Sequence, residues 1–137
     1  VTAIAARMAK AADIRSLKDL VARAGRHADR GKPAVEDFLK ADKAFHLALA
    51  RISQNPIYVS VLKTVHENIH RYYERYLSME SREMRENVQD LNAIVAAVEE
   101  KEPEKARSLA QTHVRRFNRY MKERKHHQSE EDATKLD

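Results

Sequence analysis

Glycine and proline are scarce in this chain: only two glycines and three prolines are present among 137 residues. Chains with many reversals need these residues in their turns, so the scarcity excludes a sandwich, a barrel or a meander. Alanine, leucine, glutamate, lysine and arginine dominate the sequence, and these residues lose the least on entering a helix. We therefore predict one all-α domain.

Cysteine is absent and seven histidines are present, which narrows the chemistry that the chain can support. Disulfides, thiolate catalysis and cysteine-ligated metal sites are excluded, so a metal would need imidazole and carboxylate ligands. No apolar run approaches the roughly 18 residues that span a bilayer, and no signal peptide precedes the first helical pattern. We expect a cytoplasmic protein. Because the chain begins at Val1, without an initiator Met, we expect it to lack an N-terminal part.

Apolar residues recur at spacings of three and four, and this pattern predicts an antiparallel bundle of about six helices. The expected ranges are Ala3–Ala11, Asp13–Asp29, Val35–Ile52, Ile57–Leu77, Arg82–Glu100 and Glu104–Lys125. Gly31 marks one break, and Asn55 is the expected cap of the fourth helix. Residues 1–125 should form the bundle. Residues 126–137 show no periodicity and are expected to be a disordered tail.

Two polar residues stand on the otherwise apolar face of the predicted third helix. Asp42 and His46 are four residues apart, so their side chains leave one face one turn apart. A buried carboxylate is costly unless it is paired, hydrogen-bonded or bound to a cation. His113, in the middle of the last apolar seam, should also point inward. Such an arrangement can hold a divalent metal in a bundle, but spacing alone favours a plain Asp42–His46 pair with His113 as a hydrogen-bonded core histidine.

His66 and His70 form a second pair with a spacing of four on the predicted fourth helix. They lie beside an apolar stripe that includes Val61 and Val65 and that should face inward. The two histidines could reach the same cavity as Asp42 or lie at its rim. The sequence favours a solvated pair at the boundary of the core, so both residues are additional candidates for the site.

The net charge of +5 and an isoelectric point near 9.5 raise the question of nucleic-acid binding. The two denser basic stretches, Arg71–Arg85 and Arg115–Lys125, both contain interleaved glutamates. A solvated helix face produces the same pattern, and we favour it over a patch that follows phosphates. The sequence has no glycine-rich phosphate loop, nucleophile elbow or His-Glu-x-x-His run, so we do not expect an enzyme.

The stretch from Asp42 to Pro56 reads Asp-Lys-Ala-Phe-His-Leu-Ala-Leu-Ala-Arg-Ile-Ser-Gln-Asn-Pro. It resembles the signature D-x-x-F-H-x-x-L-x-x-x-S-x-N-P of the FCD ligand-binding domain, found in FadR-subfamily transcription regulators of the GntR family. Residues 93–98 resemble the a-I-l-x-A-i segment of these domains, and Glu104 to Ala106, followed by His113, resembles their final helix. The resemblance extends over about Asp13 to Lys125.

The resemblance implies a helical bundle whose central cavity takes a small effector, commonly a carboxylate. Many members of the family hold a Zn²⁺- or Ni²⁺-type ion there with one Asp and three His. Asp42, His46 and His113 correspond to three of these ligands, whereas Leu91 occupies the position of the remaining His. This implies a weakened site with an open position that an acidic effector could fill, with a metal-free cavity as the alternative. Arg85 corresponds to an arginine that could bind the effector carboxylate alongside these three ligand candidates.

The resemblance also implies an N-terminal winged helix-turn-helix domain, which these residues do not contain, and a homodimer. Effector binding would then change the packing of the bundle and shift the paired DNA-binding domains between geometries. Operator DNA would be bound by the missing domain, because no recognition helix lies in this sequence. Two other functions stay open: a basic helical bundle that binds nucleic acid directly and, less favoured, a metal-dependent enzyme.

Overall fold

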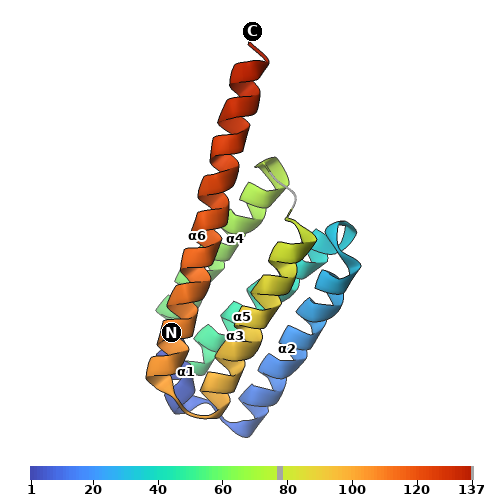
Figure 1. The fold of residues 1–137 in the computed structure, drawn as a ribbon. Coiled ribbons are helices and arrows are strands. Elements are labelled where there is room, and N and C mark those ends of the chain that lie inside the picture. The colour runs from blue at the N-terminus through green and yellow to red at the C-terminus, as the bar shows by residue number, and fades with distance from the viewer. Residues whose placement is uncertain (77–78, 137) are drawn as a thin grey trace.

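Helices make up nearly all of the chain that the structure describes, residues 1–76 and 79–136 (Figure 1). The structure is a computed structural model, and its side chains are described except at 74–76 and 124–128. Its elements are α1 (Thr2–Met8), α2 (Ala11–Arg30), the 3-10 helix η1 (Lys32–Ala34), α3 (Val35–Ile52), α4 (Pro56–Tyr76), α5 (Ser81–Glu99) and α6 (Pro103–Thr134). No strand occurs in the described ranges, so the prediction of an all-α fold is confirmed. None of these helices is long and apolar enough to cross a membrane.

The long helices run alternately in opposite directions, so that α3 and α5 oppose α2, α4 and α6 (Figure 1). α2 packs against α3 and α5, α3 packs against α4, and α5 packs against α6. The short α1 lies against α6 and also contacts α3 and α5. The predicted antiparallel bundle is therefore confirmed.

Two apolar clusters fill the bundle. The first core cluster joins α1, α2, α3, α5 and the start of α6, and it includes Ala5, Ala6, Leu17, Phe45, Leu49, Leu91, Ile94, Val98 and Ala106. The second core cluster joins α2, α3, α4 and α5, and it includes Ala24, Phe38, Leu39, Tyr73, Met79 and Met84. Burial of these side chains is the main favourable term for folding.

Short polar segments set the ends of the helices. Gly31 follows α2 with a φ of 74°, and its N–H donates to the carbonyl oxygen of Ala28 at 3.1 Å. This φ favours glycine, and a Cβ there would also lie 2.9 Å from Oγ of Ser81 at the start of α5. Asn55 Oδ1 accepts a hydrogen bond from the N–H of Ile57 at 3.0 Å and so caps α4. The predicted break and cap are both confirmed.

α4 is less buried than its apolar pattern predicts. Val61 and Val65 are expected to point inward, but they are 54% and 43% exposed. α4 packs mainly against α3, which leaves part of its apolar surface uncovered by the rest of the chain. Apolar periodicity identifies a face of a helix but not the partner that covers it, so the inward prediction is wrong for Val61. Val65 does line the cavity beside Asp42 but is only partly covered.

α6 continues to Thr134, beyond the end that the sequence predicts near Lys125. The last turns of α6 thus lie within the segment 126–137 that the sequence predicts as a disordered tail. Gln128, Glu130, Glu131 and Ala133 in this segment favour a helix and need no apolar face. α6 extends past the ends of the other helices, so no core imposes an apolar period on its last turns (Figure 1).

Candidate functional site

Asp42 and His46 point into the bundle from one face of α3. Asp42 is only 6% exposed, and its Oδ1 lies 3.3 Å from Nε2 of His46. Nearby on the same helix, Phe38, Phe45 and Leu49 are fully buried, so the local sequence places a carboxylate beside an apolar core. The prediction that Asp42 is buried is confirmed.

His113 reaches the same place from α6. Its ring stacks on that of His46, with 5.4 Å between the ring centroids and 23° between the planes. Each of Asp42, His46 and His113 offers one potential ligand atom, and these three atoms all lie within 4.8 Å of one another. The fold therefore brings together Asp42, His46 and His113, which the sequence predicts to point into the bundle.

Two buried atoms of this group, Asp42 Oδ1 and His46 Nε2, have no hydrogen-bond partner among the described residues. They lie 3.3 Å apart without the geometry of a hydrogen bond. Two ligand atoms held at about 2.0–2.1 Å by a tetrahedral ion lie roughly 3.4 Å from each other, so this separation suits a shared ion. Two imidazoles and one carboxylate are also a donor set that Zn²⁺- and Ni²⁺-type ions accept. The residues present fit a divalent transition metal.

Burial and the neighbouring imidazoles determine the charges of this group. Burial by itself raises the pKa of Asp42, but His46, supported by His66 and His113, outweighs burial and lowers this pKa to about 2. For His66, burial lowers the pKa to about 4, and His46 adds to this effect while Asp42 opposes it. At neutral pH, Asp42 is therefore a carboxylate and His66 a neutral imidazole.

His66 is buried beside this group, and His70 is not part of it. His66 is 9% exposed, its Nδ1 lies 3.7 Å from Asp42 Oδ2, and its ring stacks on that of His46 at 4.5 Å. The favoured interpretation of His66 as solvated is therefore wrong, because α4 packs against α3 at this level. His70 is half-buried and lies outside the residues that line the adjoining cavity.

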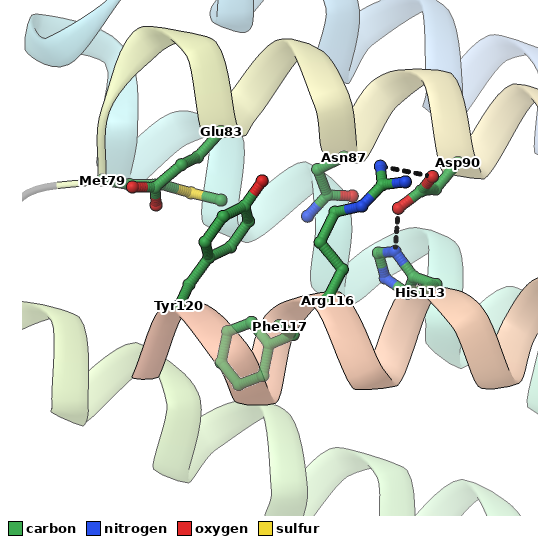
Figure 2. A pocket seen from close by; sticks show the side chains of 8 residues that line it. All are labelled: Met79, Glu83, Asn87, Asp90, His113, Arg116, Phe117 and Tyr120. Carbon is green, nitrogen blue, oxygen red and sulfur yellow. Dashed lines mark hydrogen bonds and ion pairs between the residues drawn. The ribbon is translucent and has the colours of Figure 1, made fainter. Parts of the chain in front are cut away.

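Leu91 stands where the resemblance places another histidine, and it is fully buried in the first core cluster. Its neighbour Asp90 faces α6 and has a partner for each oxygen (Figure 2). Oδ2 lies 3.1 Å from Nδ1 of His113, and Oδ1 accepts a hydrogen bond from Nη1 of Arg116 at 2.8 Å. Because Asp90 engages Nδ1 of His113, Nε2 is the nitrogen left for an ion. Asp90 thus acts through His113 and does not itself join the group.

The contacts of Asp90 with His113 and Arg116 were not predicted from the sequence. The signal was a polar stripe on α5: Glu83, Asn87 and Asp90 follow at spacings of four and three, so they share one face. These side chains face α6 and line a small pocket between the two helices (Figure 2). There the Oδ1 atom of Asn87 is buried without a hydrogen-bond partner among the described residues.

A larger cavity of about 260 Å³ adjoins the Asp42 group. Its lining residues are Leu39, Asp42, His46, Leu62, Val65, His66, Ile69, Tyr73, Met79, Asn87, His113, Val114, Phe117 and Asn118. Asp42 and the three stacked or paired histidines all contribute to this wall, so a ligand in the cavity would lie against them. Arg85 is exposed and lines neither this cavity nor the pocket between α5 and α6, so the structure does not bring it to the other predicted effector residues.

The sequence profile of the FCD domain matches residues 1–116 of this chain. Among solved structures, E. coli McbR/YncC is similar, with a TM-score of 0.74 and 18% sequence identity. The match covers 89% of this chain and 60% of the other, so this chain spans about 60% of the length of that protein. No curated protein matches the sequence significantly.

The profile match extends over most of the chain, and the chain therefore belongs to the FCD domain family. This is the family of effector-binding regulatory domains whose signature the segment from Asp42 to Pro56 resembles. The likeness to McbR/YncC supports the same helical-bundle fold.

Proposed function

We propose that this chain is the effector-sensing domain of a bacterial transcription regulator of the GntR family and FadR subfamily, and not an enzyme. The observation that carries this proposal is the convergence of Asp42, His46 and His113 on the wall of a cavity inside the bundle. Mostly apolar cavities with a few convergent polar groups are the usual form of small-molecule sites. Membership of the FCD family supports the same function.

In this proposal, Asp42, His46 and His113 hold a divalent transition metal of the Zn²⁺ or Ni²⁺ type. When bound, such an ion would supply a positive charge and an open coordination position for the carboxylate of a small effector. Asp90 engages Nδ1 of His113 and so leaves its Nε2 available as a ligand. Leu91 supplies no donor atom, so we expect weaker metal binding than in a site with three histidine ligands.

The position of the cavity explains how an effector would influence DNA binding. Its wall is formed by side chains of α3, α4, α5 and α6, so an occupant would bridge all four helices. α1 packs against α6, where the Thr2 hydroxyl donates to the carbonyl oxygen of Ala106 at 3.4 Å. A winged helix-turn-helix domain preceding α1 would therefore be joined to the helix that carries His113. A shift of α6 on effector binding would change the placement of the DNA-binding domains in a cytoplasmic homodimer.

Metal analysis combined with mass spectrometry of co-purified small molecules tests this proposal. The purified chain should contain a divalent transition metal, a small carboxylate or both. His46→Ala and His113→Ala should lose most of the bound ion, because each substitution removes one of three protein ligands. His27→Ala, which removes a histidine of α2 outside the cavity, is the matched control and should retain it.

Circular dichroism should show that the three variants keep their helices. Unchanged ion and ligand contents in both His46→Ala and His113→Ala would contradict the proposal. DNA binding by this domain alone, falling steeply with salt, would instead identify a basic bundle that contacts nucleic acid directly. Metal-dependent turnover of a bound compound would identify an enzyme.

A further inference from the structure

An apolar surface lies on α4 and α6, outside both core clusters. It consists of five large hydrophobic side chains that are 36% to 68% exposed, namely Ile57, Tyr58, Val61, Val65 and Val114, and we call it the α4 patch. The first four residues follow one another on α4 at spacings of three and four, so they share one face of that helix. Val114 of α6 lines the same cavity as Val65. Exposed apolar surface of this kind on a water-soluble domain marks an interaction site.

The α4 patch is almost free of charge. Between Ile57 and Val65, α4 has a single charged residue, Lys63, in a chain that is 34% charged. Lys63 is two positions from both Val61 and Val65, so its side chain points roughly 160° away from theirs. The net charge of the chain is +5, so contacts between two copies through other faces would on average bring like charges together. The α4 patch can meet a second copy of itself without this repulsion, whereas an acidic partner would be attracted to the basic faces.

The α4 patch is also symmetric about Val61. Ile57 and Val65 each lie four residues from it, one on either side. Two α4 helices that pack antiparallel about a two-fold axis at Val61 bring Ile57 of each copy against Val65 of the other, and the two Val61 side chains against each other. The same residues therefore supply both sides of the contact, which is the requirement for a two-fold dimer.

The α4 patch borders the opening of the cavity that contains Asp42. Val65 and Val114 line this cavity from α4 and α6, yet both side chains are exposed, so the cavity reaches the surface between them. α4 packs mainly against α3, whereas α6 packs against α5 and α1. Over their described residues, α4 and α6 therefore pack little against each other, and this side of the bundle is not closed by the chain itself.

We propose that the α4 patch is the surface through which two copies of this chain associate, and that each copy covers the cavity opening of the other. Burial of the apolar side chains drives the association. The partner lies over Val65 and Val114, so the cavity is complete only in the dimer. A ligand that binds the covered cavity then stabilises the dimer, and the dimer strengthens its binding. This link to binding rests on the proposed function, whereas the contact between the two copies does not.

Sedimentation velocity of two oppositely charged variants tests the contact. The unmodified chain should be a dimer, and the dimers of Val61→Lys and Val61→Glu should each dissociate at least about 100-fold more readily, because like charges meet at the two-fold axis. An equimolar mixture of the two variants should form dimers again, because opposite charges then face each other. Ala22→Lys, at an exposed position of α2, is the control and should stay dimeric. Circular dichroism checks that every variant keeps its helices.

A single thiol tests whether the partner covers the cavity. The chain has no cysteine, so Val114→Cys places one reactive group at the opening. Its reaction with a water-soluble maleimide should be about tenfold slower in the concentrated dimer than in the dilute monomer, because the thiol reacts only when the contact opens. Adding Val61→Lys should restore the fast reaction at every concentration. Ala22→Cys, on α2, is the control, and its reaction rate should not depend on concentration.

Four results would overturn the inference. A monomeric unmodified chain, or dimers that persist in both Val61→Lys and Val61→Glu, would show that the α4 patch is not the contact. Failure of the mixed variants to pair would exclude a two-fold axis at Val61. A Val114→Cys reaction that is equally fast in monomer and dimer would show that the cavity opening is not covered. The proposed function is judged separately, by the ion and small-molecule contents of His46→Ala and His113→Ala, so the two failures are distinguishable.

Discussion

α3 and α5 each belong to two different regions of the molecule. On α3, Phe45 and Leu49 are buried in the first core cluster, while His46 lines the cavity. On α5, Leu91 belongs to the first core cluster, while its neighbour Asp90 faces α6 and holds His113. The first core cluster is close-packed and apolar, and the cavity is open and partly polar. Residues that stabilise the fold and residues around the cavity therefore lie on different faces of the same helices, and not in different segments of the chain.

This separation predicts that substitutions one or two positions apart will have different consequences. A substitution in the first core cluster should lower the free energy of unfolding and leave the donor atoms of the site in place. A substitution around the cavity should change ligand affinity or its pH dependence at smaller cost to the fold. Four measurements test this distinction.

Leu17→Ala should have the largest effect. Leu17 is fully buried in the first core cluster, and truncating such a leucine costs about 2–5 kcal/mol of unfolding free energy. Urea denaturation followed by circular dichroism measures the change, and the folded variant should keep its zinc affinity. Leu136→Ala, at a position 88% exposed, is the control and should change little. Loss of zinc affinity in folded Leu17→Ala would show that the two regions are not separate.

The metal-free chain should lose stability as the pH falls from about 6.5 to about 4. Burial lowers the pKa of His66 from 6.5 to about 4, so the unfolded chain binds more protons in this range and acid favours unfolding. The loss should reach roughly 2–3 kcal/mol. The pKa of Asp42 is also lowered, from 3.8 to about 2, so its contribution persists above pH 4 and is lost only in stronger acid.

Urea denaturation at several pH values checks this dependence, with His66→Gln as the diagnostic variant. The slope between pH 6.5 and 4 should be flatter in His66→Gln than in the unmodified chain, whatever the absolute stability of the variant. An identical slope in both proteins would show that His66 is not the group that titrates.

Asp90→Ala should weaken zinc binding by about tenfold, because losing an outer partner of a histidine ligand has a cost of this order. Competition with a chromophoric chelator measures the affinity. Asp19→Ala, which removes an exposed carboxylate of α2, is the control and should have no effect. An unchanged affinity in Asp90→Ala would mean that other contacts orient His113.

Lys18→Ala should have the smallest effect. The Lys18 Nζ atom lies 2.9 Å from Oε2 of Glu99, but both side chains are about half exposed. Exposed ion pairs of this kind contribute less than about 1 kcal/mol, so the free energy of unfolding should fall by about 0.5 kcal/mol at most. A loss comparable to that of Leu17→Ala would contradict the assignment of stability to the apolar core.

The parts of the site that sequence predicts are those fixed by the helical period. Asp42 and His46 share a face because they are four residues apart, and His113 points inward, with 11% of its side chain exposed, because its seam is apolar. Gly31 and Asn55 mark helix ends because their local chemistry suits those positions. None of these inferences requires knowledge of which helices are neighbours.

The features of the site that the sequence does not predict depend on which helices are neighbours. His66 is buried because α4 packs against α3 at its level, and Val61 is exposed because α4 packs mainly against α3, which does not cover it. The contact between Asp90 and Arg116 joins α5 to α6, so spacing within either helix does not reveal it. The apolar pattern of a helix predicts the face on which a side chain lies, and the packing of the helices determines which residues that side chain contacts.

The turn at Gly31 contacts the start of α5, the helix that carries Asp90. A Cβ at this position would come within 2.9 Å of Ser81 Oγ, and the adjacent Lys32 pairs with Glu80 at 3.1 Å. α5 is one continuous helix from Ser81 to Glu99, so a displacement of its first turn is carried along it to Asp90. Gly31→Ala is therefore expected to shift the first turn of α5 and to weaken the contact of Asp90 with His113, although Gly31 does not line the cavity.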